Sequence, residues 1–345
     1  MIAVVILNWN GAEMLRRFLP SVVEHSHPLG EVIVADNGST DNSLEILQQE
    51  FPEVRTLVLD RNYGFAEGYN EAFRRLEIIA PQRYEYYLLL NSDVRVTADW
   101  LRPLHTYMEQ HPEVAAAQPK LRAEWAHDTL EYAGAAGGYI DRYGYPFCRG
   151  RLLSVVEKDH GQYDDIASIF WATGAALLIR QSDWWAVGGL DGRFFAHNEE
   201  IDLCWRLRAR GRGIVCVPQS VVYHVGGGTL PQEHPRKTYL NFRNNLTMLF
   251  KNLPDAELKP VMRVRRFLDF VAFVQFLVKG DWANAKAVRK ARRDFHQWQS
   301  DFVKDRQENL SRMVLNPIPE RVNRSLIVGF FLKGQKTFSA FMQRS

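Results

Sequence analysis

The stretch VVILNWNG (residues 4–11) joins a short apolar run to a polar turn, and VIVADNGSTDNS (residues 32–43) repeats this arrangement. Short apolar runs of this kind are typical of parallel β-strands that are buried on both faces. Between the two runs, residues 12–24 have the spacing of an amphipathic helix. The two stretches therefore predict a β-α-β unit, with helices packed on a parallel sheet.

Two further runs extend the same pattern. We predict strands at residues 3–8, 31–35, 56–59 and 86–91, separated by helices at residues 12–24, 42–51 and 65–79. The fold class is α/β, with a doubly wound, Rossmann-like sheet that binds its ligand beyond the carboxyl ends of the strands. That rule selects four polar segments, which are residues 8–11, 36–39, 61–64 and 91–93.

The rest of the chain predicts a mixed half and a helical tail. Residues 132–150 read as hairpins and loops, followed by strands at 175–179, 214–217 and 221–224 and a helix at 199–210. Beyond Pro254 the pattern is helical, with no strand signal. We expect residues 1–254 to form one domain with two halves, residues 1–120 and 121–254, and residues 255–345 to form a basic amphipathic helical region.

Composition excludes several classes of protein. The 345 residues are 46% hydrophobic and 24% charged, which excludes disordered, collagen-like and coiled-coil chains. The three cysteines lack CxxC spacing, so neither a disulfide framework nor a zinc cluster is indicated. Because the first residues also lack the pattern of a secretory leader, we expect a cytoplasmic protein.

Charge is unevenly distributed along the chain. Residues 255–345 carry 18 Lys and Arg against 9 Asp and Glu, whereas residues 1–254 carry 25 against 31. In this tail, residues 267–278 are mostly apolar but too few to span a membrane, and Val288, Ala291, Phe295, Trp298 and Phe302 recur at helical spacing. We expect residues 267–302 to contact an anionic membrane surface peripherally. The alternative is a helical bundle packed on the catalytic domain or on a second subunit.

The strand ends suggest a nucleotide site read by side chains. Neither a GxGxxG run nor a P-loop is present, so the phosphate cradles of those motifs are absent. Asp36 can accept hydrogen bonds from a base or a ribose, and Asn62 and Asn70 can contact the base edge. Asp93 follows a buried strand, where a carboxylate is costly unless it is paired or bound to a cation such as Mg²⁺ or Mn²⁺ with a diphosphate. The alternative is that Asp93 caps the helix predicted near residues 99–110.

Together, the ordered motifs resemble a known family. They are VVILNWNG, VIVADNGSTDNS, NYGFAEGYN (62–70), LLLNSDV (88–94), WATGAALLIR (171–180), HNEEIDLCWRLRARG (197–211) and VVYHVGGGT (221–229). In this order and spacing they resemble the family 2 inverting glycosyltransferases of the GT-A fold, particularly the bacterial rhamnosyltransferase-like branch. The resemblance covers about residues 1–230.

The resemblance implies roles for the strand-end residues. Asn91-Ser92-Asp93 stands where the family has its DXD metal motif, with Asn91 in place of the first Asp, which leaves metal binding mainly to Asp93. Trp171, Thr173 and Gly174 would lie near the donor sugar and diphosphate. The expected nucleotide-binding residues are Asn8, Asn10, Asp36, Asn62, Gly64, Asn70 and Asn91.

The family's acidic pair matches Glu199-Glu200 at the start of a predicted helix. By the resemblance, Glu200 is the general base, although the usual residue there is the shorter Asp. His224 would complete the metal site, and glycines 226–228 would let the backbone approach a diphosphate. His197 and Glu199 are candidates for acceptor contacts. Asp202 is expected only to pair with Arg206 one helical turn later.

These expectations combine into a metal-dependent inverting glycosyltransferase. It would move a sugar, with rhamnose as a candidate, from a UDP or dTDP donor to a surface-glycan or lipid-linked acceptor at the inner face of the cytoplasmic membrane. An oligomer is compatible with the sequence, and no nucleic-acid partner is expected. The alternatives are a nucleotidyltransferase and a sugar-nucleotide or nucleic-acid binding protein without transferase activity.

Overall fold

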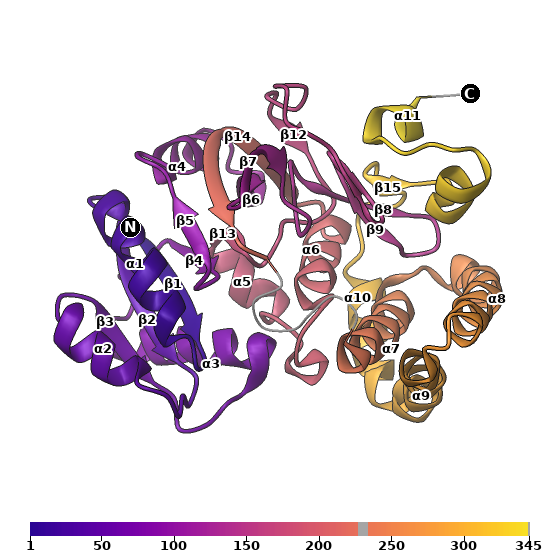
Figure 1. Cartoon of the computed structure of the whole chain (residues 1–345), viewed down its shortest axis with the longest axis horizontal. Coiled ribbons are helices and arrows are strands. Elements are labelled where there is room, and N and C mark those ends of the chain that lie inside the picture. Colours follow the sequence, from indigo (N-terminus) through magenta and orange to yellow (C-terminus); the bar gives the residue numbers. More distant parts are fainter. Residues whose placement is uncertain (227–233, 344–345) are drawn as a thin grey trace.

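A ten-stranded mixed sheet forms the centre of the molecule (Figure 1). The computed structural model describes residues 1–226 and 234–343. The strands of this sheet are β1 (Ile2–Asn8), β2 (Gly30–Asp36), β3 (Arg55–Val58), β4 (Tyr86–Leu90), β5 (Val94–Val96), β6 (Val114–Ala123), β7 (Ala126–Leu130), β12 (Ala167–Ser168), β13 (Ala176–Arg180) and β14 (Gly213–His224). Their main order is β12-β14-β6-β13-β4-β1-β2-β3, with β5 paired to β14 and β7 to β6.

The N-terminal half confirms the predicted parallel unit. β1 lies between β2 and β4 and is parallel to both, and β3 continues the parallel run on the outer side of β2. Every residue of β4 is buried, as expected for a central strand. The register places Asn8 opposite Asp36, so these two strand-end side chains are neighbours.

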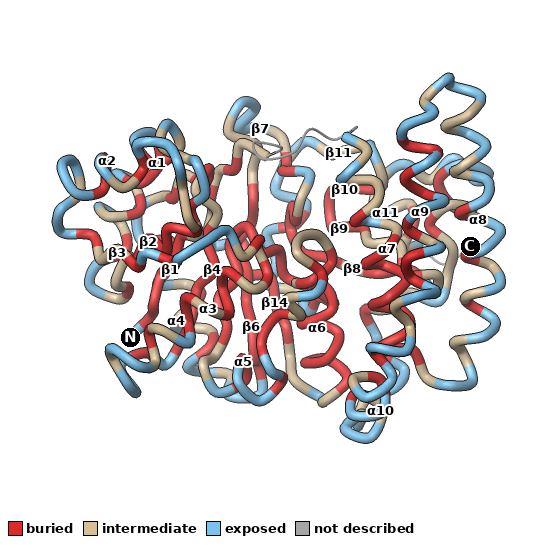
Figure 2. Tube along the Cα trace, turned by 90° about the horizontal axis from the view of Figure 1, so that it is seen from below, coloured by how far each residue is buried: buried red, intermediate tan, exposed pale blue. Residues whose placement is uncertain are grey.

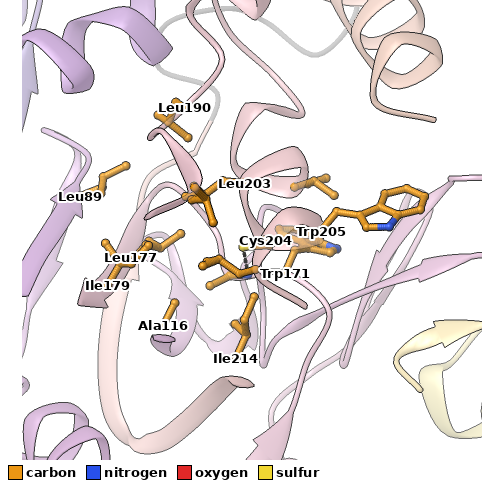
Figure 3. Packing of buried hydrophobic residues seen from close by; sticks show 14 of the residues in the cluster. Leu89, Ala116, Trp171, Leu177, Ile179, Leu190, Leu203, Cys204, Trp205 and Ile214 are labelled. Atoms are coloured by element: carbon orange, nitrogen blue, oxygen red, sulfur yellow. Dashed lines mark hydrogen bonds between the residues drawn. The ribbon is translucent and has the colours of Figure 1, made fainter. Parts of the chain in front are cut away.

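The helices cover both faces of this sheet. In the first two thirds of the chain they are α1 (Ala12–Ser26), α2 (Ser43–Glu50), α3 (Gly64–Ile79), α4 (Leu101–Gln110), α5 (Gln181–Val187) and α6 (Glu199–Ala209). One core cluster joins α1 and α4 to the sheet, and a second joins α3, α5 and α6 to its other face. In the second cluster, Trp171, Leu203 and Cys204 lie together (Figure 3), with the Ala172 N–H donating to Cys204 Sγ at 3.4 Å.

A small second sheet lies beside the first. It consists of β8 (Gly138–Asp141), β9 (Pro146–Cys148), β10 (Arg151–Leu152), β11 (Val155–Val156) and β15 (Arg321–Val322). β8 and β9 form the hairpin expected in residues 132–150. The expectation that no strand follows Pro254 is wrong, because β15 pairs with β8. A strand of two residues is too short to give a periodic signal in the sequence. It is extended because it pairs with β8.

The two strands predicted near the end of the catalytic region are one strand. β14 runs from Gly213 to His224, and its register against β6 shifts between Val217 and Val221. The sequence around Pro218 predicts a break between two strands. In the structure it is a bulge in one continuous strand.

The C-terminal region is mostly helical. It contains α7 (Pro235–Asn252), α8 (Asp255–Val278), α9 (Trp282–Trp298), α10 (Val303–Ser311) and α11 (Phe338–Met342). α7 packs against α9 and α10, and α9 packs against α8. Most of the predicted α9 stripe points into this bundle, since Val288, Ala291, Phe295 and Phe302 are buried. Within the described residues, no helix is long and apolar enough to cross a membrane.

Candidate active site

The ends of β1 and β2 form a buried polar cluster. Asn8 Nδ2 donates to Asp36 Oδ2 at 3.0 Å and lies 3.2 Å from Ser39 Oγ. The Asn10 backbone N–H donates to the same Ser39 hydroxyl at 2.9 Å. Asn8 and Asp36 have no exposed surface. The cluster brings Asn8, Asn10 and Asp36 together and fixes their positions in advance of any ligand.

A second polar turn lies beside this cluster, at the start of α3. Asn62 Oδ1 accepts from the Gly64 N–H at 2.7 Å, and Asn37 Nδ2 donates to Asn62 Oδ1 at 3.2 Å. Gly64 has a φ of +76°, and a Cβ there would lie 2.6 Å from the Phe195 ring, so the position requires glycine. Sequence reasoning missed Asn37, although its place directly after Asp36 was a usable signal.

Asn70 lies farther along α3 and has a different set of partners. Its Nδ2 donates to the Leu190 carbonyl at 2.8 Å, and its Oδ1 accepts from the Leu190 N–H at 3.0 Å. Both ends of the amide are therefore used to hold the loop that leads to α6. Asn70 therefore positions that loop. Its side-chain amide is already bonded to Leu190, so it is not available for the predicted contact with a base.

A carboxylate and imidazole cluster follows β4. Asp93 Oδ1 lies 3.2 Å from His224 Nε2, Asn91 Nδ2 lies 3.3 Å from the same nitrogen, and Glu131 Oε2 lies 3.4 Å from His224 Nδ1. Asp93, Glu131 and His224 are all buried. Sequence reasoning missed Glu131, because only the pairing of β6 with β7 and β14 brings residue 131 beside residue 224.

The cluster is electrostatically balanced around His224. Burial lowers the pKa of the imidazole, but the charges and hydrogen bonds of Glu131 and Asp93 outweigh it and raise the pKa to about 10. For Asp93, burial raises the pKa, and the His224 hydrogen bond and charge reverse this to leave it below its usual value. The imidazolium therefore occupies the position of a cation between two carboxylates.

The cluster also fits a divalent cation once His224 Nε2 has lost its proton, because only a neutral imidazole binds a metal. Two ligands in neighbouring positions of a six-coordinate ion, each about 2.1 Å from it, lie about 3 Å apart, which matches the 3.2 Å between Asp93 Oδ1 and His224 Nε2. Among the described residues, no three His, Cys, Asp or Glu side chains are grouped as a metal site. Such an ion would therefore need oxygens from a ligand or water. Of the glycine run, Gly227 and Gly228 lie outside the described residues, as does Thr229.

The turn at the start of β13 connects this cluster with α6. The Asn91 N–H donates to the Ala175 carbonyl at 3.0 Å, and the Thr173 N–H donates to Gln118 Oε1 at 3.0 Å. A Cβ on Gly174 would lie 3.9 Å from Glu200 Cβ. The turn thus lies between the Asp93 cluster and the acidic pair.

Trp171 belongs to the core. Its indole N–H donates to the Tyr139 carbonyl at 2.9 Å, and its ring lies against Gly138, where a Cβ would be 2.1 Å away. Figure 3 shows the residue among the packed side chains around α6. The predicted donor-side contacts therefore depend on Thr173 and Gly174, because the Trp171 side chain is used in packing.

Glu199 and Glu200 begin α6 as predicted, and they are unusual in being unsatisfied. Among the described residues, neither Glu199 Oε2 nor Glu200 Oε2 has a hydrogen-bond partner, and both atoms are buried. Burial raises the pKa of Glu200 to about 7. Burial and then the charge of Glu200 raise the pKa of Glu199 well above its usual value. Both carboxyl groups therefore bind a proton more readily than an ordinary glutamate does.

The loop before the pair has a strained backbone. Phe195, His197 and Asn198 have φ values of 67°, 71° and 68°, in the left-handed region that non-glycine residues avoid. Asn244 of α7 holds the loop, since its Nδ2 donates to the carbonyls of Phe194, Ala196 and His197 at 3.0, 2.8 and 2.7 Å. Strain maintained by a neighbouring helix is typical of functional sites.

Two predictions remain near the acidic pair: His197 as an acceptor contact, and Asp202 as the partner of Arg206. Burial, followed by the charge of Lys237, lowers the pKa of His197 to about 4, which leaves a neutral imidazole beside the pair. Asp202 pairs with Arg206 at 3.0 Å, as predicted, and also with Lys251 at 2.8 Å. Asp202 is therefore an anchor of α6, fully neutralised and fully buried.

With this geometry established, the chain can be compared with known proteins. Residues 3–163 match the model of the family described as glycosyl transferase family 2. This match covers just under half of the chain. Together with the relatives below, it supports a family 2 glycosyltransferase, the family predicted from the ordered motifs, and therefore a transferase enzyme.

Individual relatives of the chain agree with this match. The chain is 28% identical over 233 residues to N-acetylglucosaminyl-diphospho-decaprenol L-rhamnosyltransferase of Mycobacterium tuberculosis (strain CDC 1551 / Oshkosh), covering 64% of this chain and 75% of that protein. Among solved structures, GalNAc-T7 with UDP, GalNAc and Mn²⁺ superposes with a TM-score of 0.58 and 15% identity, over 92% of this chain and 58% of that one. Residues 1–349 of S. aureus TarS with UDP-GlcNAc give 0.54 and 14%, over 90% and 88%. These likenesses confirm the GT-A fold.

Proposed function

We propose that this enzyme is a metal-dependent inverting glycosyltransferase that uses a nucleoside diphosphate sugar as its donor. The observation that carries the proposal is the juxtaposition of two groups across one turn. The Asp93 and His224 cluster bonds through Asn91 to Ala175, and Glu200 lies against Gly174 of the same turn. A donor held at that turn would have its diphosphate toward the cluster and its anomeric carbon toward Glu200.

Each residue group has one part in the proposed reaction. The Asn8, Asp36 and Ser39 cluster would hold the nucleoside, and Asp93 and His224 would hold the cation, which supplies positive charge to the leaving diphosphate. Glu200 takes the proton from the acceptor hydroxyl while that oxygen attacks the anomeric carbon. The bond from this carbon to the diphosphate oxygen breaks, the nucleoside diphosphate leaves, and a single displacement inverts the configuration.

The buried acidic pair favours catalysis over binding alone. Burying a carboxylate without a hydrogen-bond partner is costly, and Glu199 and Glu200 each have such an oxygen among the described residues. A binding protein would gain nothing from that cost. In an enzyme, the same burial raises the pKa of Glu200 to about 7, near the optimum for a general base at neutral pH.

The choice of sugar and acceptor is inferred from the relatives. The M. tuberculosis relative is named as a rhamnosyltransferase with a diphospho-decaprenol acceptor. We assign the present enzyme a deoxyhexosyl donor, with rhamnose as the first candidate, and a lipid-linked glycan acceptor at the inner face of the cytoplasmic membrane. In this assignment residues 1–254 perform the transfer, and residues 255–345 form an accessory helical region.

A ligand panel tests the proposal. Thermal unfolding is measured with UDP, dTDP, GDP and CMP, each with and without Mn²⁺, for wild type and Asp93→Ala. Ligand at 100 times its dissociation constant stabilises a protein by about 2.7 kcal/mol. We expect one diphosphate to stabilise wild type more with Mn²⁺ than without, and Asp93→Ala to lose that increment. An equal Mn²⁺ increment in both proteins would exclude Asp93 as the ligand.

A further inference from the structure

Helix α8 buries two charged side chains and exposes several large apolar ones. The buried residues of α8 are Val261, Arg265 and Asp269. The large side chains Phe267, Phe270 and Val278 are 65%, 59% and 82% exposed, and Val271 and Val274 are exposed as well. A surface helix ordinarily has the opposite arrangement, so the outer face of α8 is not explained by the folding of this chain.

The inner face of α8 is anchored by ions. Arg265 donates to Asp269 at 3.2 Å, to the Tyr143 carbonyl at 3.0 Å and to Asn245 Oδ1. Asp269 also accepts from Arg292 of α9. The helix is held in place by this network, and Figure 2 shows α8 at the periphery of the molecule with its outer side exposed.

Cationic side chains surround the apolar face. A groove of about 620 Å³ lies between α8 and α9 and is lined by residues that include Phe267, Phe270, Arg263, Arg266 and Arg289. All three of these arginines are exposed, and in the part of the chain that the structure describes no ion pair occupies them. Exposed aromatic rings beside unpaired guanidinium groups match the boundary between acyl chains and phosphate headgroups.

We propose that the outer face of α8, with the groove that it forms with α9, docks on an anionic phospholipid bilayer. The helix would lie in the plane of the membrane, with the phenylalanines and valines entering the acyl boundary and the arginines binding headgroup phosphates. This surface is the first part of the segment predicted from sequence, residues 267–302. The rest of that prediction, the stripe that begins at Val288, is mostly buried in the bundle.

Two other occupants fit the surface less well. A second copy of this chain related by two-fold symmetry would bring the same arginines against one another. Nucleic acid would pair with the arginines but would leave the aliphatic side chains of Val271, Val274 and Val278 in water. A bilayer with anionic headgroups satisfies both the charge and the apolar area.

The docking helix is connected to the acidic pair by hydrogen bonds. Arg265 of α8 bonds Asn245 of α7, and Asn245 Nδ2 contacts Asn198 Oδ1 at 3.4 Å, at the residue before Glu199. The docked helix would thus be fixed relative to the catalytic end of the site. This last step rests on the proposed function, since it gives membrane docking a use only if the acceptor is carried by a lipid.

Vesicle flotation of the full chain, without donor or acceptor, tests the surface. We expect wild type to float with vesicles containing phosphatidylglycerol and not with pure phosphatidylcholine. The double variant Phe267→Ser with Phe270→Ser should lose about tenfold or more of its affinity for the anionic vesicles. Arg263→Ala with Arg266→Ala should lose about 30-fold, because each of the two cations near the surface contributes about 1 kcal/mol.

The matched control is Ile78→Ser with Ile79→Ser on α3, which removes two other exposed apolar side chains, 78% and 51% exposed. This control should float as wild type does, and all variants should unfold at the wild-type temperature. Equal flotation by the phenylalanine variant and the control would overturn the proposal, as would equal binding to neutral vesicles. A dimer in solution that the phenylalanine variant dissociates would also overturn it and assign the face to self-association. Because no donor is present, the result is independent of whether the chain transfers sugar.

Discussion

The two ends of the active site are built in opposite ways. At the nucleotide end, the buried Asp36 carboxylate accepts hydrogen bonds on both oxygens, from Asn8 Nδ2 at 3.0 Å and from the Ser39 N–H at 2.9 Å. At the other end, Glu199 and Glu200 each have a buried carboxylate oxygen without a partner among the described residues, and three residues before them have left-handed backbone.

This contrast separates binding from chemistry. The satisfied Asp36 carboxylate holds its position before the ligand arrives, so a donor that binds to it loses little free energy to rearrangement of this group. An unsatisfied carboxylate remains basic, and burial raises the pKa of Glu200 further, to about 7. The cost of burying unpartnered carboxylate oxygens is therefore located at the pair that contains the proposed general base. Substitutions at each end separately can test this difference.

The largest effect is expected from Glu200→Gln. Glutamine keeps the shape of the side chain and removes its ability to accept a proton, so kcat should fall by about 10²- to 10⁴-fold with donor affinity nearly unchanged. Steady-state kinetics and donor titration measure the two quantities. Glu53→Gln, at an exposed position, is the matched control. If Glu200→Gln transfers sugar at a near-normal rate, or fails only in donor binding, the base must be sought at another residue.

A smaller and opposite pattern is expected from Asp36→Asn. The change keeps the side-chain shape but removes the charge that strengthens its hydrogen bonds, each worth about 1.5–3 kcal/mol when an ion takes part. Donor affinity should therefore fall by about 10- to 100-fold, with kcat changed only a few-fold. An unchanged donor Kd, measured by calorimetry on a variant that unfolds at the wild-type temperature, would remove Asp36 from the nucleotide site.

The smallest effect is a gain of stability from Glu199→Gln. Burial and the neighbouring charge raise the pKa of Glu199 in the folded state. Its favourable neutral form is therefore lost as the pH rises from the unfolded pKa through the folded one, and stability falls in that window. At pH 8 the variant should melt a few degrees higher than wild type, and at pH 4 the difference should shrink. Glu53→Gln should show neither change, and an equal gain at both pH values would contradict the assigned burial cost.

Sequence predicted most of the parallel half because its signals are local. β1 to β4 are apolar runs followed by polar turns, and each turn reached the sheet edge where it was expected. The start of α6 at Glu199 was also predicted correctly, because helix starts are visible in the chain. The role of the acidic pair stays a prediction.

The remaining features depend on contacts between distant segments. Glu131 lies beside His224 only because neighbouring strands pair. Trp171 is buried in the core, where its indole N–H donates to the Tyr139 carbonyl. Helical periodicity shows that α8 has two faces, but it does not show which one faces inward. The orientation of α8 is determined by Arg265 and Asp269, because their hydrogen-bond partners lie on other elements.

The central claim, that Glu200 is the general base, is tested most directly by the pH dependence of kcat/KM for wild type and Glu200→Gln. Because kcat/KM reports the groups of the free enzyme, and the folded pKa is about 7, wild-type log(kcat/KM), taken from rates at limiting substrate, should rise with a slope of about 1 below pH 7 and level off above it. The Gln variant should be slow and lack this limb. A wild-type profile that is flat from pH 5 to 8, or a Gln variant that keeps the same limb, would contradict the account.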